Sequence, residues 1–189
     1  MTGEMANKED IIEYTMEPGR LHLWVFIMIF PLLLLTILPF LLVWDKQLLI
    51  LGWEPFYDIF IPVILAGIIM HEVLHGLGWS FFLSNGMKSV KFGINWKFLA
   101  PYCHCKSPMK AIHFGVGAAL PLVILGILPV LAGIAMGKSS FLFFGILFTW
   151  GAGGDIISIF MLFKLDNGCI VYDHPDKPGF YIKKENNRL

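Results

Sequence analysis

The sequence predicts an all-α membrane protein with about four transmembrane helices and a short β-hairpin in the loop between the second and third helices. Three observations support this prediction. Of the 189 residues, 57% are hydrophobic and only 15% are charged, an apolar share above that of ordinary soluble domains. Four apolar runs each exceed the length of about 20 residues that a helix needs to cross the hydrocarbon core. The polar segment between the middle two runs alternates as a strand does. We expect a single integral membrane domain, residues 1–189.

The predicted spans are residues 21–44, 57–83, 111–136 and 141–163. The first run is too long for the apolar part of a signal peptide and has no small-residue cleavage site, so we interpret it as a retained span. Pro121 and Pro129 lie inside the third run. Because proline has no backbone N–H, each frees a carbonyl one turn earlier, and that carbonyl needs a neighbour or water within the membrane.

The distribution of basic residues predicts the orientation. Twelve of the 14 lysines and arginines precede the first span, lie in the loop 84–110, or follow the fourth span into the tail 167–189. The positive-inside rule therefore places both termini and this loop in the cytoplasm. We expect an integral protein of a bacterial cell membrane, surrounded by the lipid bilayer. The net charge of zero gives no indication of nucleic-acid binding, and the oligomeric state is left open.

The pentapeptide His71-Glu72-Val73-Leu74-His75 lies inside the second span. Histidines four residues apart share one helix face, so both imidazoles can reach a single Zn²⁺ ion, with Glu72 beside them for proton transfer. Ionisable side chains at bilayer depth cost roughly 2.5–3.5 kcal/mol each, so they mark functional sites. The alternative is a pair of core histidines without metal, hydrogen-bonded to Glu72.

Asp155 is the favoured third ligand. A catalytic zinc site uses three protein ligands and leaves one position to water, and no acidic residue separates Glu72 from Asp155. The second and fourth spans run in the same direction, and His75 and Asp155 each lie about 12 Å from the cytoplasmic end of their spans. Alternatives stay open: Asp155 as a local cap or partner, or a third ligand from the loop or the next span, namely Cys103, His104, Cys105 or His113.

The loop 84–110 has two interpretations. Its alternation and aromatic content favour a hairpin that turns near residues 93–96, whose open edge would hold an extended substrate. The alternative is an amphipathic loop that rests on the lipid headgroups. Cys103-His104-Cys105 lacks the second pair of ligands that a structural zinc site requires, so we interpret it as reduced thiols in a strand.

His71-Glu72-x-x-His75 in a membrane helix, a hairpin-like loop and a later intramembrane aspartate resemble the site-2 protease class of intramembrane zinc metalloproteases. The chain as a whole, including residues 101–108 and Gly153-Gly154-Asp155, more specifically resembles the small membrane family of putative zincin peptidases. The resemblance implies hydrolysis of peptide bonds in a membrane protein or peptide substrate, with Glu72 as the catalytic carboxylate and His71, His75 and Asp155 as zinc ligands. The aspartate setting differs from the Asn-Pro-Asp-Gly-like pattern usual in site-2 proteases.

The predicted chemistry is zinc-assisted attack of water on a peptide bond near the cytoplasmic side of the bilayer, with Glu72 as general base. Asn95, His104 and His113 are candidates for a supporting hydrogen-bond donor or for substrate binding. Two other classes remain: a metal transporter, and a non-catalytic metal-binding membrane module.

Overall fold

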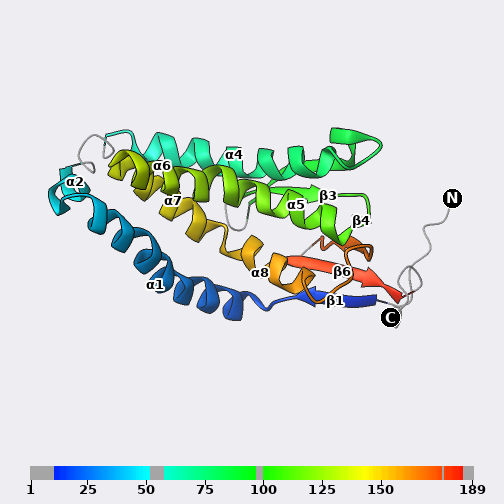
Figure 1. The fold of residues 1–189 in the computed structure, drawn as a ribbon. Coiled ribbons are helices and arrows are strands. Elements are labelled where there is room, and N and C mark those ends of the chain that lie inside the picture. The colour runs from blue at the N-terminus through cyan, green and yellow to red at the C-terminus, as the bar shows by residue number, and fades with distance from the viewer. Residues whose placement is uncertain (1–10, 52–57, 97–99, 176, 185–189) are drawn as a thin grey trace.

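The computed structural model describes residues 11–51, 58–96, 100–175 and 177–184. Among these, three helical runs are long and apolar enough to cross a membrane, and a bent pair of helices supplies a fourth span if the pair is counted as one. Figure 1 shows these runs lying side by side. The chain is therefore consistent with a membrane protein of three or four spans.

The first two spans correspond to long single helices. α1 (Pro18–Val43) contains the first predicted span except its last residue, Trp44. α4 (Phe60–Ser80) is shorter than the predicted second span, whose first residue, Tyr57, lies outside the described residues. A short helix, α2 (Lys46–Leu51), follows α1.

The third span is interrupted in its hydrogen-bonding pattern, as its two prolines predict. It consists of α5 (Ala111–Pro121), a π-helical segment (Leu122–Ile127) and α6 (Leu128–Met136). The wide turn begins directly after Pro121, where the i→i−4 ladder loses a donor. Gly137, in the left-handed conformation with φ 65°, ends the run.

The fourth span differs from the straight helix predicted for residues 141–163. It consists of α7 (Ser139–Gly151) and α8 (Gly153–Leu162), which meet at an angle of 54°. Ala152 leaves the helical conformation, with φ −76° and ψ 12°. Glycines stand on both sides of it, and glycine weakens a helix by about 1 kcal/mol relative to alanine. The bend therefore falls where the sequence is least helical.

Two antiparallel sheets accompany the helices, so the prediction of an all-α protein with a single hairpin is confirmed only in part. One is four-stranded, in the order β1 (Ile11–Thr15), β6 (Gly179–Lys183), β5 (Ile170–Asp173), β4 (Met109–Lys110). β5 and β6 lie in the segment 167–189 that we predicted as a tail. Their apolar residues alternate with partly exposed ones, and Val171, Phe180 and Ile182 are fully buried.

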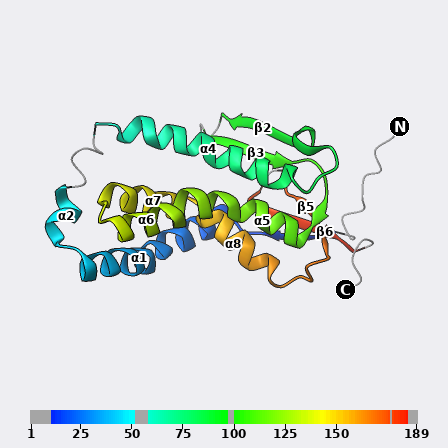
Figure 2. The same cartoon turned by 45° about the horizontal axis from the view of Figure 1, so that its top comes forward.

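The second sheet is the predicted hairpin, formed by β2 (Val90–Asn95) and β3 (Ala100–Cys105). A 3-10 helix (Gly86–Ser89) leads into it from α4. Pairing continues through most of the range 93–96 predicted for the turn, because Gly93 pairs with Tyr102 and Asn95 with Ala100. The chain leaves the strand at Trp96, the last residue of that range. The hairpin lies along α4 in Figure 2, and the Phe92 ring packs against Gly76.

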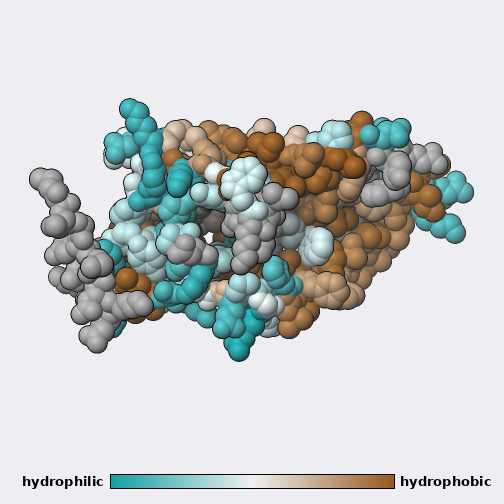
Figure 3. All heavy atoms as spheres, turned by 180° about the vertical axis from the view of Figure 1, so that it is seen from behind, coloured by the Kyte–Doolittle hydropathy of each residue, from teal (hydrophilic) through white to brown (hydrophobic). Residues whose placement is uncertain are grey.

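Both sheets lie at one end of the helices (Figure 1). Hydrophilic residues gather over this end, hydrophobic side chains cover most of the helical part, and hydrophilic residues appear again at its far tip (Figure 3). A buried cluster that includes Trp79, Phe114 and Phe180 joins α4 and α5 to the four-stranded sheet. The fold thus places a polar, sheet-covered end directly against an apolar bundle.

Candidate metal centre

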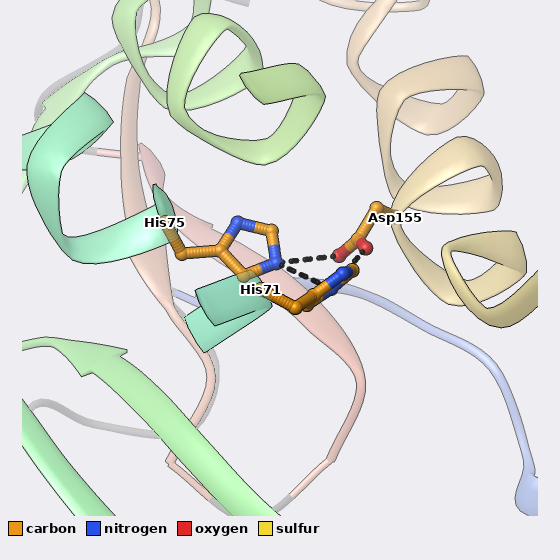
Figure 4. A group of neighbouring side chains, drawn as sticks. All are labelled: His71, His75 and Asp155. Carbon is orange, nitrogen blue, oxygen red and sulfur yellow. Dashed lines mark hydrogen bonds and ion pairs between the residues drawn. The ribbon is translucent and has the colours of Figure 1, made fainter. Parts of the chain in front are cut away.

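Two neighbouring elements bring three ligand-type side chains together. His71 and His75 lie one turn apart on α4, and Asp155 lies in the first turn of α8. The His71 Nε2 atom is 3.1 Å from Asp155 Oδ2 and 3.1 Å from His75 Nε2, and His75 Nε2 is 3.3 Å from Asp155 Oδ1. Figure 4 shows the three side chains converging on one point between the helices. They are the one such group found among the described residues.

These distances fit a tetrahedral zinc ion. Zinc bonds of about 2.0–2.1 Å to nitrogen and oxygen place neighbouring ligand atoms about 3.3 Å apart. Here the two Nε2 atoms lie 3.1 Å apart, and they lie 3.1 and 3.3 Å from different oxygens of the Asp155 carboxylate. With one ligand atom taken from each residue, all three atoms lie within 4.8 Å of one another. Two histidines and a carboxylate also form a donor set typical of catalytic zinc, which leaves a fourth position for water or substrate.

The orientation of the His75 ring adds a chemical reason for a cation. His75 Nδ1 lies 3.0 Å from the Gly117 carbonyl oxygen. A carbonyl only accepts, so Nδ1 carries the proton and Nε2 of the neutral ring presents a lone pair. That lone pair faces a carboxylate oxygen at 3.3 Å. Two acceptors at this separation need a positive charge between them or a second proton on the ring, and a metal ion meets this need.

Close packing of α4 on α5 fixes the His75 ring. The Trp79 ring stacks on it, with centroids 5.2 Å apart, and Trp79 Nε1 donates to the Phe114 carbonyl at 3.0 Å. A Cβ at Gly78 would lie 2.7 Å from the Gly117 Cα, so glycine at position 78 permits this approach of the two backbones. His75 is 5% exposed, and its ring has little freedom to turn.

The bend between α7 and α8 positions Asp155. α8 packs against α1 at Gly153, where a Cβ would lie 2.7 Å from Val25 Cγ2. Trp150, just before the bend, donates from Nε1 to the Val25 carbonyl at 2.8 Å. Both sides of the bend are therefore held to the same residue of α1, and the first turn of α8 is directed toward α4.

Glu72 and the three ligand-type residues line a pocket of about 600 Å³. One wall comes from β3, through Tyr102, Cys103 and His104. The lining also includes residues between β5 and β6, and the bent helix contributes Gly151, Gly154 and Ser158. The backbone of Cys103 forms a hydrogen bond with the Glu72 carboxylate. The pocket thus joins the candidate metal centre to a strand and a turn at the polar end.

Among the three candidates for a supporting role, His104 lies in the pocket. His104 Nδ1 is 2.8 Å from Asp173 Oδ2, and the same oxygen accepts from the Cys105 backbone N–H at 2.9 Å. Sequence reasoning missed Asp173, which ends β5 and also lines the pocket. The signal that could have found it is the short alternating strand that precedes it, followed by the turn-forming residues of segment 173–179.

The other two candidates have different outcomes. His113 stacks on Phe82, with ring centroids 4.3 Å apart, and is not among the described residues that line the pocket. The Asn95 backbone belongs to β2, but its side chain lies outside the described part of the structure.

The three cysteines are free thiols. Burial raises the pKa of Cys105 to about 11 and also raises the pKa of Cys103. Both thiols therefore stay protonated near neutral pH in the metal-free protein. Their positions in β3 agree with the interpretation of Cys103-His104-Cys105 as thiols in a strand.

One of the comparisons with known proteins found a match. The model of the family described as "Putative zincin peptidase" matches residues 64–170. This range contains the histidine pair, Glu72, the hairpin and Asp155, and ends before Asp173. No curated protein matches the chain. No solved structure matches it either. The match covers more than half of the chain and implies zinc as the cofactor, and the chain therefore belongs to the putative zincin peptidase family.

Proposed function

We propose that this protein is an intramembrane zinc metalloprotease that hydrolyses peptide bonds of membrane-associated substrates near the cytoplasmic side of the bilayer. The observation that carries the proposal is the convergence of His71, His75 and Asp155 in one pocket with Glu72. Membership of the zincin peptidase family supports zinc peptidase chemistry in general. A His-Glu-x-x-His helix paired with a later membrane aspartate is also similar to the site-2 protease arrangement.

In the proposed mechanism, His71, His75 and Asp155 would hold the zinc ion. When bound, zinc polarises a peptide carbonyl and increases the acidity of water. Glu72 takes a proton from the attacking water and returns it to the leaving amine. His104, oriented by Asp173, donates a hydrogen bond to the substrate carbonyl oxygen as its negative charge develops.

The outer edge of β3 supplies a place for an extended substrate. Alternate residues of an antiparallel strand direct their backbone groups to opposite sides. The Cys103 backbone interacts with Glu72 and the Cys105 N–H with Asp173, so these residues face away from β2 and toward the pocket. The outward-facing carbonyls of Pro101 and Cys103 would accept from the main chain of a bound peptide, which would then lie beside Glu72. Asp173 already occupies the next edge position, at Cys105, so this is where the bound segment would end.

The location of the pocket favours cleavage near the membrane surface. His75 lies five residues before the end of α4, which corresponds to about 7.5 Å. Asp155 is seven residues before the end of α8, or about 10.5 Å. Both ends lie beside the sheets (Figure 1). Under the orientation predicted by the basic residues, this is the cytoplasmic side.

The test is the Glu72→Gln variant. This substitution keeps nearly the same shape but removes the proton acceptor, so zinc content should be retained while cleavage of a membrane peptide falls by at least ~100-fold. Glu17→Gln is the matched control, because Glu17 is exposed, stands just before α1 and is not among the described residues that line the pocket; it should cleave normally. Undiminished cleavage by Glu72→Gln would remove Glu72 from the mechanism. If the unmutated, zinc-loaded protein cuts no peptide of a broad membrane panel, a transporter or a non-catalytic binding module becomes the better interpretation.

A further inference from the structure

Pro121 leaves one carbonyl of α5 without its usual partner. In an α-helix the carbonyl of residue 117 accepts from the N–H of residue 121, but residue 121 is proline and has no N–H. The next amide along the chain, that of Leu122, donates to Ala119. The helix backbone at residues 121 and 122 therefore leaves the Gly117 oxygen available.

The partner that this oxygen takes is the zinc-site histidine His75, whose Nδ1 lies 3.0 Å away on α4. The bond lies at a close contact between the two helices, where a Cβ at Gly78 would lie 2.7 Å from the Gly117 Cα. Pro121 is itself fully buried, so water does not reach the proline ring to take the place of the missing N–H. Since the Gly117 oxygen can only accept, the bond fixes the proton on Nδ1 and leaves the Nε2 lone pair directed at His71 and Asp155.

We propose that Pro121 is a positioning residue of the metal centre: by removing a backbone donor from α5, it reserves the Gly117 carbonyl for His75 and so selects the ring tautomer that binds zinc. This inference rests on the proposed role of His75 as a ligand. It gives the buried proline a chemical function in addition to its effect on helix shape. An N–H at position 121 would share the Gly117 oxygen with His75, and the bond to His75 would become weaker and less well aligned.

The experiment compares two replacements of Pro121 that differ in a single donor. Pro121→Ala restores the backbone N–H, whereas replacement by lactic acid, the α-hydroxy analogue of alanine, removes the ring but supplies no N–H. Zinc affinity is measured on the purified full chain by competition with a chromophoric chelator. Pro121→Ala should weaken zinc binding on the order of 10-fold, the lower end of what loss of a ligand's outer partner costs. The lactic acid variant should bind within about twofold of the unmutated protein, since it keeps the bond to His75.

Pro129→Ala is the matched control, because Pro129 lies in the same span, in α6, and does not line the pocket among the described residues. Its zinc affinity should be unchanged. Equal zinc affinity in the alanine and lactic acid variants of Pro121 would overturn the inference. His75→Ala separates the two proposals: if it keeps full zinc affinity, the proposed ligand set fails. Loss of affinity in His75→Ala without a difference between the two Pro121 variants refutes only the role of Pro121.

A second measurement does not depend on the folding of any Pro121 variant. Nitrogen-15 NMR of the unmutated protein reports which ring nitrogen of His75 carries the proton, with the signal assigned through its loss in His75→Gln. We expect protonated Nδ1 in both the metal-free and the zinc-loaded protein. A proton on Nε2 in the metal-free protein, or zinc on Nδ1, would overturn the inference.

Discussion

The His71 Nε2 and Asp155 Oδ2 atoms lie 3.1 Å apart, although 84 residues separate them in the sequence. The contact depends on the bend between α7 and α8, since Asp155 lies in the first turn after it. It joins the second and fourth predicted spans at the polar end of the bundle. Whether this pair binds zinc is the question on which the proposed chemistry depends.

Asp155→Ala should abolish stoichiometric zinc binding, because a catalytic site that loses one of three protein ligands is left with two imidazoles. Zinc content of the purified protein, measured by atomic emission, is the test. Asp166→Ala, at an exposed position after α8, is the control and should keep its zinc. Full zinc in Asp155→Ala together with loss in His104→Ala would show that the third ligand comes from β3.

Gly153→Ala should destabilise the protein, whereas Gly154→Ala should not. A Cβ at Gly153 would press on Val25 of α1, but a Cβ at Gly154 meets nothing within 4 Å. Overpacking costs typically 1–3 kcal/mol, while alanine at an unconstrained helix position gains up to about 1 kcal/mol over glycine. Thermal unfolding in detergent compares the two variants. Equal unfolding temperatures for the two variants would contradict the tight contact between α1 and α8 at Gly153.

Sequence reasoning reached the metal centre because its signals are local or restrictive. A histidine pair at helical spacing is a short-range pattern, and Asp155 is the single acidic residue in a long apolar stretch. The 54° bend and Asp173 were missed for physical reasons. A run of apolar residues has the same hydropathy whether straight or bent, and short strands such as β5 depend on pairing with distant segments. The match in depth between His75 and Asp155 was inferred for a straight helix, and the geometry that brings them together involves a bend.

His104→Ala should lower turnover roughly 100-fold, the cost of removing one donor to the developing oxyanion, without changing zinc content. Asp173→Asn should lower it less, because it disturbs the orientation of His104 rather than removing the ring. The double variant should be little worse than His104→Ala, since the two residues act through one contact at 2.8 Å. Turnover and zinc content are measured on each variant. Additive losses would show that Asp173 acts independently of His104.

Ionisation of the Cys105 thiol should lower the free energy of unfolding as the pH rises above 9. Its pKa is about 11 in the folded protein, compared with an ordinary value of 9.0, because burial disfavours the thiolate. The unfolded chain therefore loses this proton first, and the stability that the buried thiol contributes is complete below pH 9 and lost between about 9 and 11. Unfolding midpoints across this range, compared with those of Cys105→Ala, isolate the contribution. Identical pH profiles for the two proteins would contradict it.

The orientation in the membrane should place the sheet-bearing end in the cytoplasm. β1, the hairpin and the C-terminal strands share one end of the molecule, and the basic residues that the positive-inside rule counts flank these segments. In a background without the three native cysteines, a membrane-impermeant maleimide applied to intact cells should label Gln47→Cys but not Lys88→Cys. Both positions are exposed, so a difference in labelling reports side rather than burial. Permeabilised cells provide the control, because both cysteines should then react. Labelling of Lys88→Cys alone in intact cells would invert the orientation and place the pocket on the opposite face of the membrane, where substrates would have to approach from outside.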